Sequence, residues 1–326
     1  GSLPPTLLQG SISLLYKKKD PKDPRNYRPI TLLNCDYKIL TRILNTRILR
    51  ALTSAAAPDN TGFVPGRSIL DNARLLSLLQ AAVEEEGMEG AMIFLDFEKA
   101  FDSVSHDLIL KGLERMGFGP DICSWVSLIY NPSSPPVRRV VANGHQGSYW
   151  PIRRGVAQGC PLSPALFLIV AEGLSQMLNG GVTLPDGQHL QLQGIQVGSL
   201  PPFRVSQFAD DTVPLLANLT SDLSTMWAIL DIFQKGSGML INKSKTEGLQ
   251  LGRSASTACP SLFHSTRDTD GLSITHLTTT EVTLSLQDPT AAPLRIPRLH
   301  PAQEEAASAI EAIGTTRTKL PFQALL

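Results

Sequence analysis

The chain has 326 residues, of which 42% are hydrophobic, so it can form one large domain or two ordinary ones with a sizeable core. Its formal net charge is zero, so composition alone indicates no polyanionic partner. Its four cysteines are far apart in sequence, so they suggest neither a disulfide framework nor a cysteine zinc site, and a reducing intracellular compartment fits best. No apolar run is long enough to span a bilayer, so we expect no membrane partner and a location in the nucleus or cytoplasm.

The charge is distributed unevenly. Residues 1–50 contain ten Lys and Arg against three Asp, a net charge of +7. Such a segment suits a polyanion, although a solvated basic surface would have the same composition.

Residues 1–90 are expected to be mostly helical. YKILTRILNTRILRAL (37–52) places its apolar residues close to a helical period. Residues 70–83 form a second helix-like run, which ends at EEEGMEG. Residues 91–252 then alternate strand-like and helix-like runs, which is typical of an α+β fold.

Carboxylates mark two of the strand-like runs. AMIFLDF (91–97) reads as a buried strand that carries Asp96 near its end, followed by a helix that Ser103 or Ser105 can cap. FRVSQFADDTVPLL predicts a β-hairpin with Asp210 and Asp211 at or beside its tip. An ordinary turn would also accept aspartates at this place.

If this hairpin pairs beside the 91–97 strand, Asp96, Asp210 and Asp211 converge. Three neighbouring carboxylates would raise one another's pKa values. Two Mg²⁺ ions, or Mn²⁺ in their place, would offset this repulsion, because hard cations prefer oxygen ligands.

Six motifs occur in an order that resembles the reverse transcriptases of non-LTR (LINE-type) retrotransposons, over roughly residues 3–252. They are YKKKDPKDPRNYRPITLLN (16–34), NTGFVPGRSILDN (60–72), IFLDFEKAFDSVSH (93–106), RRGVAQGCPLSPALF (153–167), FADDT (208–212) and SGMLINKSKTEGL (237–249). The resemblance implies the α+β fold of a right-hand polymerase, with fingers at 1–90 and a palm at 91–252 that packs a small antiparallel sheet on helices. It also implies RNA-directed DNA polymerisation, with an RNA template, a DNA primer and dNTPs as partners.

The same resemblance assigns roles near the metal ions. Asp96 and Asp210 match the two catalytic aspartates, and Asp211 is the neighbour that would bind metal more loosely. The backbone carbonyl of Phe97 would add a metal ligand.

Four further residues match dNTP-binding positions: Arg28, Phe101, Gln158 and Lys245. Arg28 would contact the triphosphate, Phe101 would exclude a ribose 2′-hydroxyl, and Gln158 would bond near the incoming dNTP. Lys245 would lie near the triphosphate and could protonate pyrophosphate. For Phe101 the alternative is plain core packing, and for Lys245 a solvated surface position.

Four features depart from the family's pattern. Ala157 stands where Arg is usual. Pro214 falls in the strand after the aspartates, and because proline has no N–H to donate, we expect that strand to lie at an edge, to bulge or to end early. Residues 253–326, with 19 Ser and Thr among 74 residues, replace the expected thumb and read as a weakly ordered tail. The endonuclease of the family's pattern is expected outside residues 1–326. A full-length element would carry the thumb and endonuclease elsewhere, and this chain alone is expected to synthesise DNA weakly or not at all.

Two other readings remain open. The chain could be an inactive retroelement relic that at most binds RNA through its basic first fifty residues. It could also resemble an intron-type maturase, which binds and helps to fold an RNA.

Overall fold

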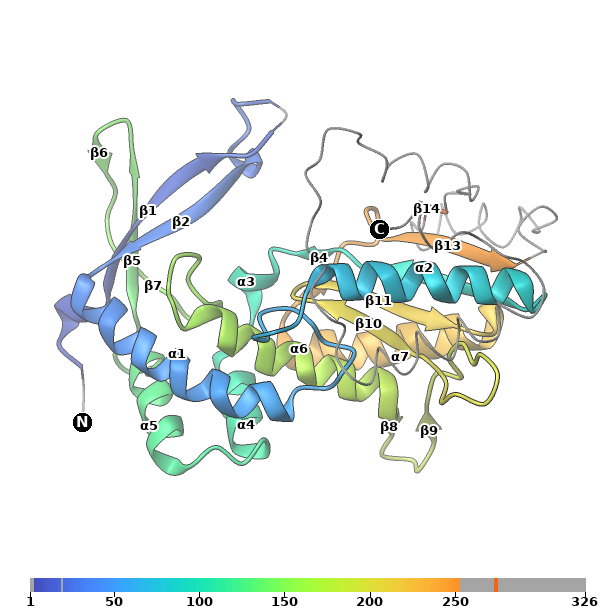
Figure 1. Cartoon of the computed structure of the whole chain (residues 1–326). Coiled ribbons are helices and arrows are strands. Elements are labelled where there is room, and N and C mark those ends of the chain that lie inside the picture. Colours follow the sequence, from blue (N-terminus) through green and yellow to red (C-terminus); the bar gives the residue numbers. More distant parts are fainter. Residues whose placement is uncertain (1–2, 19, 253–272, 275–326) are drawn as a thin grey trace. The chain divides into compact units, whose positions relative to one another are not determined.

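The computed structural model describes residues 3–18, 20–252 and 273–274 (Figure 1). These residues divide into two compact units, each built from three stretches of chain. The first unit comprises the described residues up to Ala56, Glu98–Gly173 and Phe233–Leu240; the second comprises Ala57–Phe97, Leu174–Ile232 and the described residues from Ile241 onward. The division into 1–90 and 91–252 stays a prediction. In the described part of the chain, every helix is too short or too polar to cross a membrane.

A five-stranded sheet organises the first unit. Its strands are β1 (Gln9–Tyr16), β2 (Tyr27–Leu33), β5 (Val137–Ala142), β6 (His145–Gln146) and β7 (Trp150–Pro151). The order is β2-β1-β5-β6, with β7 also pairing with β5. The 3-10 helix η1 (Pro5–Leu8) precedes β1, and η2 (Pro24–Asn26) lies in the turn between β1 and β2.

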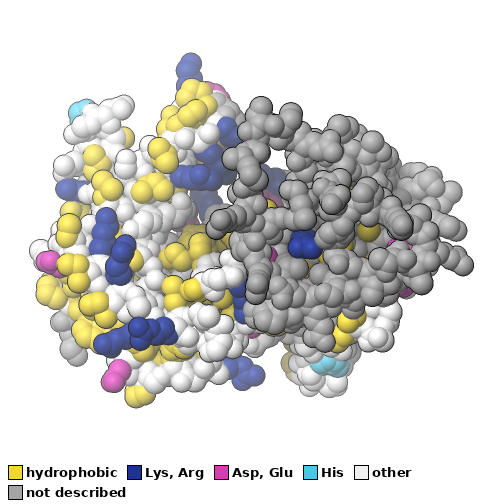
Figure 2. All heavy atoms as spheres, viewed as in Figure 1, with side chains coloured by type: hydrophobic (Ala, Val, Ile, Leu, Met, Phe, Trp, Pro, Cys, Tyr) yellow, Lys and Arg dark blue, Asp and Glu magenta, His cyan; other side chains and the backbone are white. Residues whose placement is uncertain are grey.

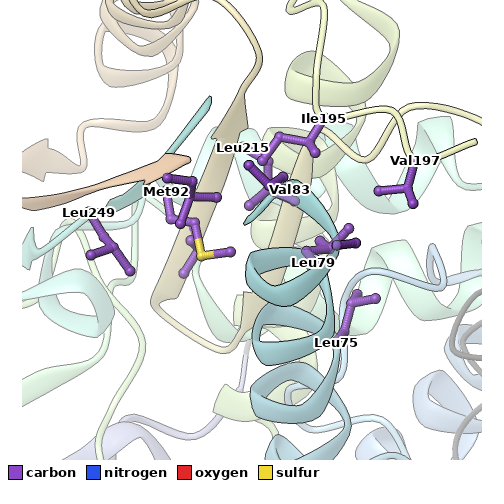
Figure 3. Packing of buried hydrophobic residues seen from close by; sticks show 11 residues of the cluster. Leu75, Leu79, Val83, Met92, Ile195, Val197, Leu215 and Leu249 are labelled. Carbon is purple, nitrogen blue, oxygen red and sulfur yellow. The ribbon is translucent and has the colours of Figure 1, made fainter. Parts of the chain in front are cut away.

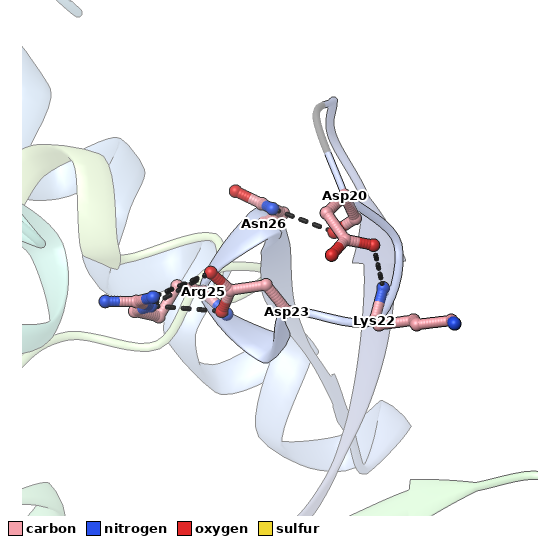
Figure 4. A network of polar contacts seen from close by, with 5 residues as sticks. All are labelled: Asp20, Lys22, Asp23, Arg25 and Asn26. Atoms are coloured by element: carbon pink, nitrogen blue, oxygen red, sulfur yellow. Dashed lines mark hydrogen bonds and ion pairs between the residues drawn. The ribbon is translucent and has the colours of Figure 1, made fainter.

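Local polar contacts shape that turn (Figure 4). The Asp23 carboxylate caps η2 by accepting a hydrogen bond from the Arg25 backbone N–H, and it also pairs with the Arg25 guanidinium at 2.9 Å. The Asn26 side chain donates to the Asp20 carbonyl at 2.8 Å. These contacts fix the entry to β2, the strand that carries Arg28.

Helices α1 (Cys35–Ala55) and α4 (His106–Arg115) of the first unit begin at side-chain caps. Helix α1 contains the predicted 37–52 helix, starts at the Asn34 cap and buries one face, which includes Tyr37 and Leu44. Ser105 caps α4, so this cap prediction is confirmed. The first unit also contains α3 (Ala100–Ser103) and α5 (Pro120–Ile129). Two further helices, α6 (Ser163–Gly180) and α7 (Leu219–Ser237), each begin in one unit and end in the other.

A second sheet organises the second unit. Its strand order is β10 (Val205–Phe208), β11 (Asp211–Leu216), β3 (Glu89–Phe94), β13 (Glu247–Gly252) and β14 (Ser273–Ile274). Two short pairs, β4 (Phe97–Glu98) with β12 (Leu240–Ile241) and β8 (Val182–Thr183) with β9 (His189–Leu190), complete the strands. In this sheet β3 is antiparallel to both of its neighbours.

Helix α2 (Ile69–Glu85) packs on this sheet and supplies one side of its core. Ser68 and Asp71 form a capping box at its first turn. Leu79 and Val83 of the helix are fully buried and cluster with Met92 and Leu215 of the sheet (Figure 3). The α+β fold is confirmed, whereas the predicted weakly ordered tail lies outside the described residues except for Ser273 and Ile274.

The expectation for Pro214 is wrong. Strand β11 lies inside the sheet, between β10 and β3, and continues to Leu216. The β11–β3 ladder bridges Leu95 with Thr212 and resumes at Leu215 with Met92, so the same register continues on both sides of Pro214. The sheet thus accommodates the missing N–H as a local gap in one ladder.

Candidate active site

The two neighbouring aspartates lie at a hairpin turn, as predicted. Strands β10 and β11 pair antiparallel up to Phe208 with Asp211, so Ala209 and Asp210 form the turn itself. Ala209 adopts a left-handed conformation with φ 57°. Such a φ is uncommon for a residue other than glycine, so the turn needs support from its surroundings.

Asp96 lies on the neighbouring strand. The predicted 91–97 strand is interrupted: β3 ends at Phe94, β4 begins at Phe97, and Asp96 occupies the break. The Leu95 N–H donates to the Thr212 carbonyl at 3.0 Å. Because Leu95 precedes Asp96 and Thr212 follows Asp211, the strand pairing brings the two carboxylate residues to the same end of the sheet.

The loop after β12 also contacts Asp96. The Asn242 N–H donates to the Asp96 carbonyl at 2.7 Å, and the Asp96 N–H donates to the Thr246 hydroxyl at 3.4 Å. Lys245 of the same loop places Nζ 3.6 Å from Asp96 Oδ2. The two side chains are 63% and 41% exposed, so water screens this ion pair.

The carboxylates influence one another electrostatically. The pKa of Asp211 is raised, first by partial burial and then by the negative charges of Asp210 and Asp96. Hard oxygen donors with excess negative charge suit a divalent cation. Among the described residues, no three His, Cys, Asp or Glu side chains are gathered closely enough to hold a metal ion. The oxygen donors of these residues suit Mg²⁺ by their chemistry alone, and the metal-binding roles of Asp96, Phe97, Asp210 and Asp211 remain proposals.

The other predicted nucleotide-binding residues belong to the first unit. Phe101 stacks on Phe167 with ring centroids 4.5 Å apart, which gives it a packing role. The Gln158 side chain bonds to Asp102, and its carbonyl accepts from the Thr31 N–H at 2.7 Å. Arg28 is exposed on β2. The binding roles of Arg28, Phe101 and Gln158 remain predictions.

Glycines shape the loop before α6. Gly155 has φ 81°, and a Cβ there would lie 2.4 Å from the Asp102 carbonyl oxygen. Gly159 has φ 111°, and its Cβ would lie 2.6 Å from the Thr31 carbonyl oxygen. Both glycines therefore lie against the backbone of other segments of the first unit, where a larger side chain would not fit.

Sequence reasoning missed one group of residues near the aspartate turn. Thr61, Asn72 and Gln207 are buried polar residues that bond to one another behind the hairpin. The first two belong to the NTGFVPGRSILDN motif, to which the sequence alone assigns no chemical role. The available signal was the unusual content of polar residues for a buried segment.

Comparison with known proteins identifies the family. The model of the family described as "Reverse transcriptase (RNA-dependent DNA polymerase)" matches residues 16–280. The chain belongs to the reverse transcriptase family. The resemblance to non-LTR retrotransposon polymerases is confirmed by its relatives.

Three of these relatives come from transposable elements. The chain is 32% identical over 254 residues to the "Transposon TX1 uncharacterized 149 kDa protein" of Xenopus laevis, covering 77% of the chain and 18% of that protein. It is 30% identical over 260 residues to the "Retrovirus-related Pol polyprotein from type-1 retrotransposable element R2" of Popillia japonica, covering 80% and 34%. It is 28% identical over 242 residues to the "RNA-directed DNA polymerase from mobile element jockey" of Drosophila melanogaster, covering 72% and 24%. The chain thus spans about a third or less of relatives such as these.

The fold also matches a solved reverse transcriptase. The structure of apo telomerase from Candida tropicalis, truncated from its C-terminal domain, aligns with a TM-score of 0.52 at 14% identity. The alignment covers 76% of this chain and 51% of that chain. At this identity the likeness supports the fold alone.

Proposed function

We propose that this chain carries the nucleotidyl-transfer site of an RNA-directed DNA polymerase of a non-LTR retrotransposon. The observation that carries the proposal is the position of Asp96, Asp210 and Asp211 at one end of the sheet in the second unit, where partial burial and then the charges of the other two raise the pKa of Asp211. An RNA template, a DNA primer and dNTPs are the proposed partners, and the nucleus or cytoplasm is the proposed location.

In this mechanism the three carboxylates and the Phe97 carbonyl would hold two divalent cations, Mg²⁺ or Mn²⁺. Bound there, the cations would supply charge stabilisation to the attacking 3′-oxygen and to the leaving pyrophosphate. The primer 3′-oxygen attacks the α-phosphate of a dNTP, the bond to the bridging oxygen breaks, and pyrophosphate leaves. Lys245 could deliver a proton to pyrophosphate, because its ammonium lies beside Asp96.

The nucleotide would be recognised by charge and shape. We propose that Arg28 bonds to triphosphate oxygens through its guanidinium fork and that Gln158 contacts the incoming dNTP. The Gln158 side chain bonds to Asp102, which orients the amide if the Asp102 carboxylate accepts from its NH₂ group. Phe101 would restrict space beneath the sugar and so favour dNTP over rNTP.

The test is extension of an oligo(dT) primer on poly(rA) by the full chain, compared with Asp210→Asn. We expect the variant to lose about 1,000-fold or more in rate, because metal ligation contributes several kcal/mol to transition-state stabilisation. Asp186→Asn, in the exposed loop between β8 and β9, is the matched control and should leave the rate unchanged. Measurable extension at the same rate by wild type and Asp210→Asn would reject the assignment.

A second candidate function is RNA binding by an inactive relic. Arg42, Arg47 and Arg50 are exposed on α1, and within the described part of the chain none of them forms an ion pair. Lys and Arg side chains lie among hydrophobic ones on the surface where α1 runs (Figures 1 and 2). Such a surface suits a phosphate backbone. RNA binding that persists without primer extension would favour this reading.

A further inference from the structure

The loop Asp59–Gly62 lies beside β10, the strand that leads into the aspartate turn. The Gln207 N–H donates to the Asp59 carbonyl at 2.8 Å, and the Thr61 N–H donates to the Gln207 carbonyl at 2.9 Å. Asn60 and Gln207 form a parallel bridge between these two hydrogen bonds. The loop therefore closes the outer edge of β10 at the point where the strand approaches Asp210.

Asn72, in the first turn of α2, adds side-chain bonds to the same strand. Its Nδ2 donates to the Ser206 hydroxyl at 2.7 Å and to the Gln207 carbonyl at 2.9 Å. Its Oδ1 accepts from the Thr61 hydroxyl. Asn72, Ser206 and Gln207 are 6%, 2% and 0% exposed, so water does not compete for these bonds.

Gly62 brings the loop backbone into contact with the turn itself. A Cβ on Gly62 would lie 2.0 Å from the Ala209 nitrogen and 2.8 Å from its Cα. Ala209 is the left-handed residue directly before Asp210. Only glycine permits this approach, so the loop supports the turn where its backbone is strained.

The loop is itself anchored at its other side. The Asp59 carboxylate accepts from the Ser175 hydroxyl at 2.6 Å and from the Asn179 amide at 2.9 Å. The Arg67 guanidinium donates to the carbonyls of Ala57 and Asn60. These bonds tie the loop to the C-terminal half of α6 and to the segment before α2, so it presents a fixed surface to the hairpin.

We propose that the loop Asp59–Gly62 and Asn72, together called the clamp, set the position of the turn that carries Asp210 and Asp211. Asn72 acts as a positioning residue for divalent cations bound by these aspartates. The inference rests on the proposed function, because that function supplies the metal ions. It adds that the clamp sets the geometry of the site that binds them. Because Gln207 Nε2 also donates to the Thr212 hydroxyl at 3.2 Å, the clamp reaches both strands of the hairpin.

The polar composition of the clamp favours positioning over stability. Asn60 Nδ2 and Gln207 Oε1 are buried without a hydrogen-bond partner among the described residues. Unsatisfied buried polar atoms destabilise a fold, whereas apolar side chains of similar shape would not. Hydrogen bonds are directional, however, so they hold a strand in one position more strictly than apolar packing does.

The test compares Asn72→Ala with Val83→Ala in the full chain. Both residues are on α2, but Val83 is a core residue outside the clamp. Mn²⁺ affinity is measured by electron paramagnetic resonance, and hydrogen exchange is measured at the amides of residues 208–211 without metal. Comparisons are made under conditions in which both variants are folded and have equal global stability. Gly62→Ala, which pushes directly on the turn, serves as a second clamp variant should Asn72→Ala fail to fold.

We expect Asn72→Ala to weaken Mn²⁺ binding by about 10- to 100-fold, as for other residues that orient metal ligands. Exchange at the turn should accelerate in Asn72→Ala and Gly62→Ala and stay unchanged in Val83→Ala. Equal exchange at the turn in the clamp variants and in Val83→Ala would overturn the proposal. A wild-type chain that binds no Mn²⁺ would instead reject the two-metal function, and the exchange measurement would still decide whether the clamp positions the turn.

Discussion

The ammonium of Lys245 forms an ion pair with the carboxylate of Asp96, with Nζ and Oδ2 separated by 3.6 Å. The lysine therefore occupies the surroundings of a carboxylate to which we assign a divalent cation. A resident ammonium competes with a metal ion for the same negative charge. The proposed reaction requires the lysine to share this carboxylate or to turn toward a triphosphate.

Lys245→Gln should separate metal binding from chemistry. Removal of the competing charge should strengthen Mn²⁺ binding by up to about fivefold, because exposed ion pairs contribute about 0.2–1 kcal/mol. Primer extension should slow by about 100-fold or more if Lys245 protonates pyrophosphate. Metal titration and single-turnover extension measure the two effects. Lys243→Gln is the control, because Lys243 is two residues away and lies over the Trp227 ring. If the Lys245 variant extends the primer as fast as the Lys243 variant, Lys245 does not protonate pyrophosphate.

Asp211 should make stability depend on pH. The pKa of Asp211 is higher in the folded state than its ordinary value of 3.8, so protonation of Asp211 stabilises the fold. This stabilisation is fully present below pH 3.8 and is lost as the pH rises through the folded-state pKa. Ionised Asp211 therefore destabilises the metal-free fold at neutral pH. In chelator, Asp211→Asn should unfold at a higher denaturant concentration than wild type at pH 7, and this difference should vanish below pH 3.8. Added Mg²⁺ should stabilise wild type more than the variant. A variant less stable than wild type at pH 7 in chelator would contradict this reading.

Phe101 should influence sugar selection. One face of its ring stacks on Phe167, so truncation of Phe101 opens space without removing a charge. We expect Phe101→Val to improve rNTP incorporation relative to dNTP by roughly tenfold or more, in the range that small steric changes in a pocket produce. The ratio of kcat/KM for dTTP and UTP on poly(rA) measures it. An unchanged ratio, together with lower stability, would assign Phe101 to core packing.

Two glycines of the first unit should respond oppositely to alanine. Gly159→Ala places a Cβ 2.6 Å from the Thr31 carbonyl oxygen at φ 111°, so it should cost about 1–3 kcal/mol. Gly173→Ala lies within α6 and meets no atom within 4 Å, so it should stabilise by up to about 1 kcal/mol. Thermal unfolding checks both, at about 2–4 °C per kcal/mol. A stabilising Gly159→Ala would show that the loop adjusts freely.

The exposed arginines of α1 should contribute to RNA affinity. Replacing Arg42, Arg47 and Arg50 with Gln should weaken binding of single-stranded RNA and reduce the slope of log affinity against log salt by about 0.7 for each phosphate that the protein no longer neutralises. Arg115→Gln, exposed at the end of α4, is the control. Fluorescence anisotropy at several salt concentrations measures the slope. If the triple variant keeps the wild-type RNA affinity and salt dependence, RNA does not bind at these arginines.

Local patterns in the sequence predicted the hairpin at FADDT, the Ser105 cap and the helix at 37–52, because each depends on neighbouring residues. The position of β11 could not be predicted, since Pro214 signals only a missing N–H, whereas pairing with both β10 and β3 depends on distant strands. The clamp was missed for the same reason. The contact of Asn72 with Gln207 joins residues 135 positions apart, and no local period records it.

The interleaved order of the two units has a consequence for how the protein is made. The Asp96 backbone bonds to Thr246, 150 positions further along the chain, and β13 pairs with β3 along its length. A ribosome that has just released β3 must synthesise most of the remaining described chain before that strand gains its second neighbour. Until then β3 keeps an open edge, at which a nascent chain is exposed to misassociation. A chaperone requirement during synthesis, relieved once Gly252 has left the exit tunnel, is the expected physiological sign of this architecture.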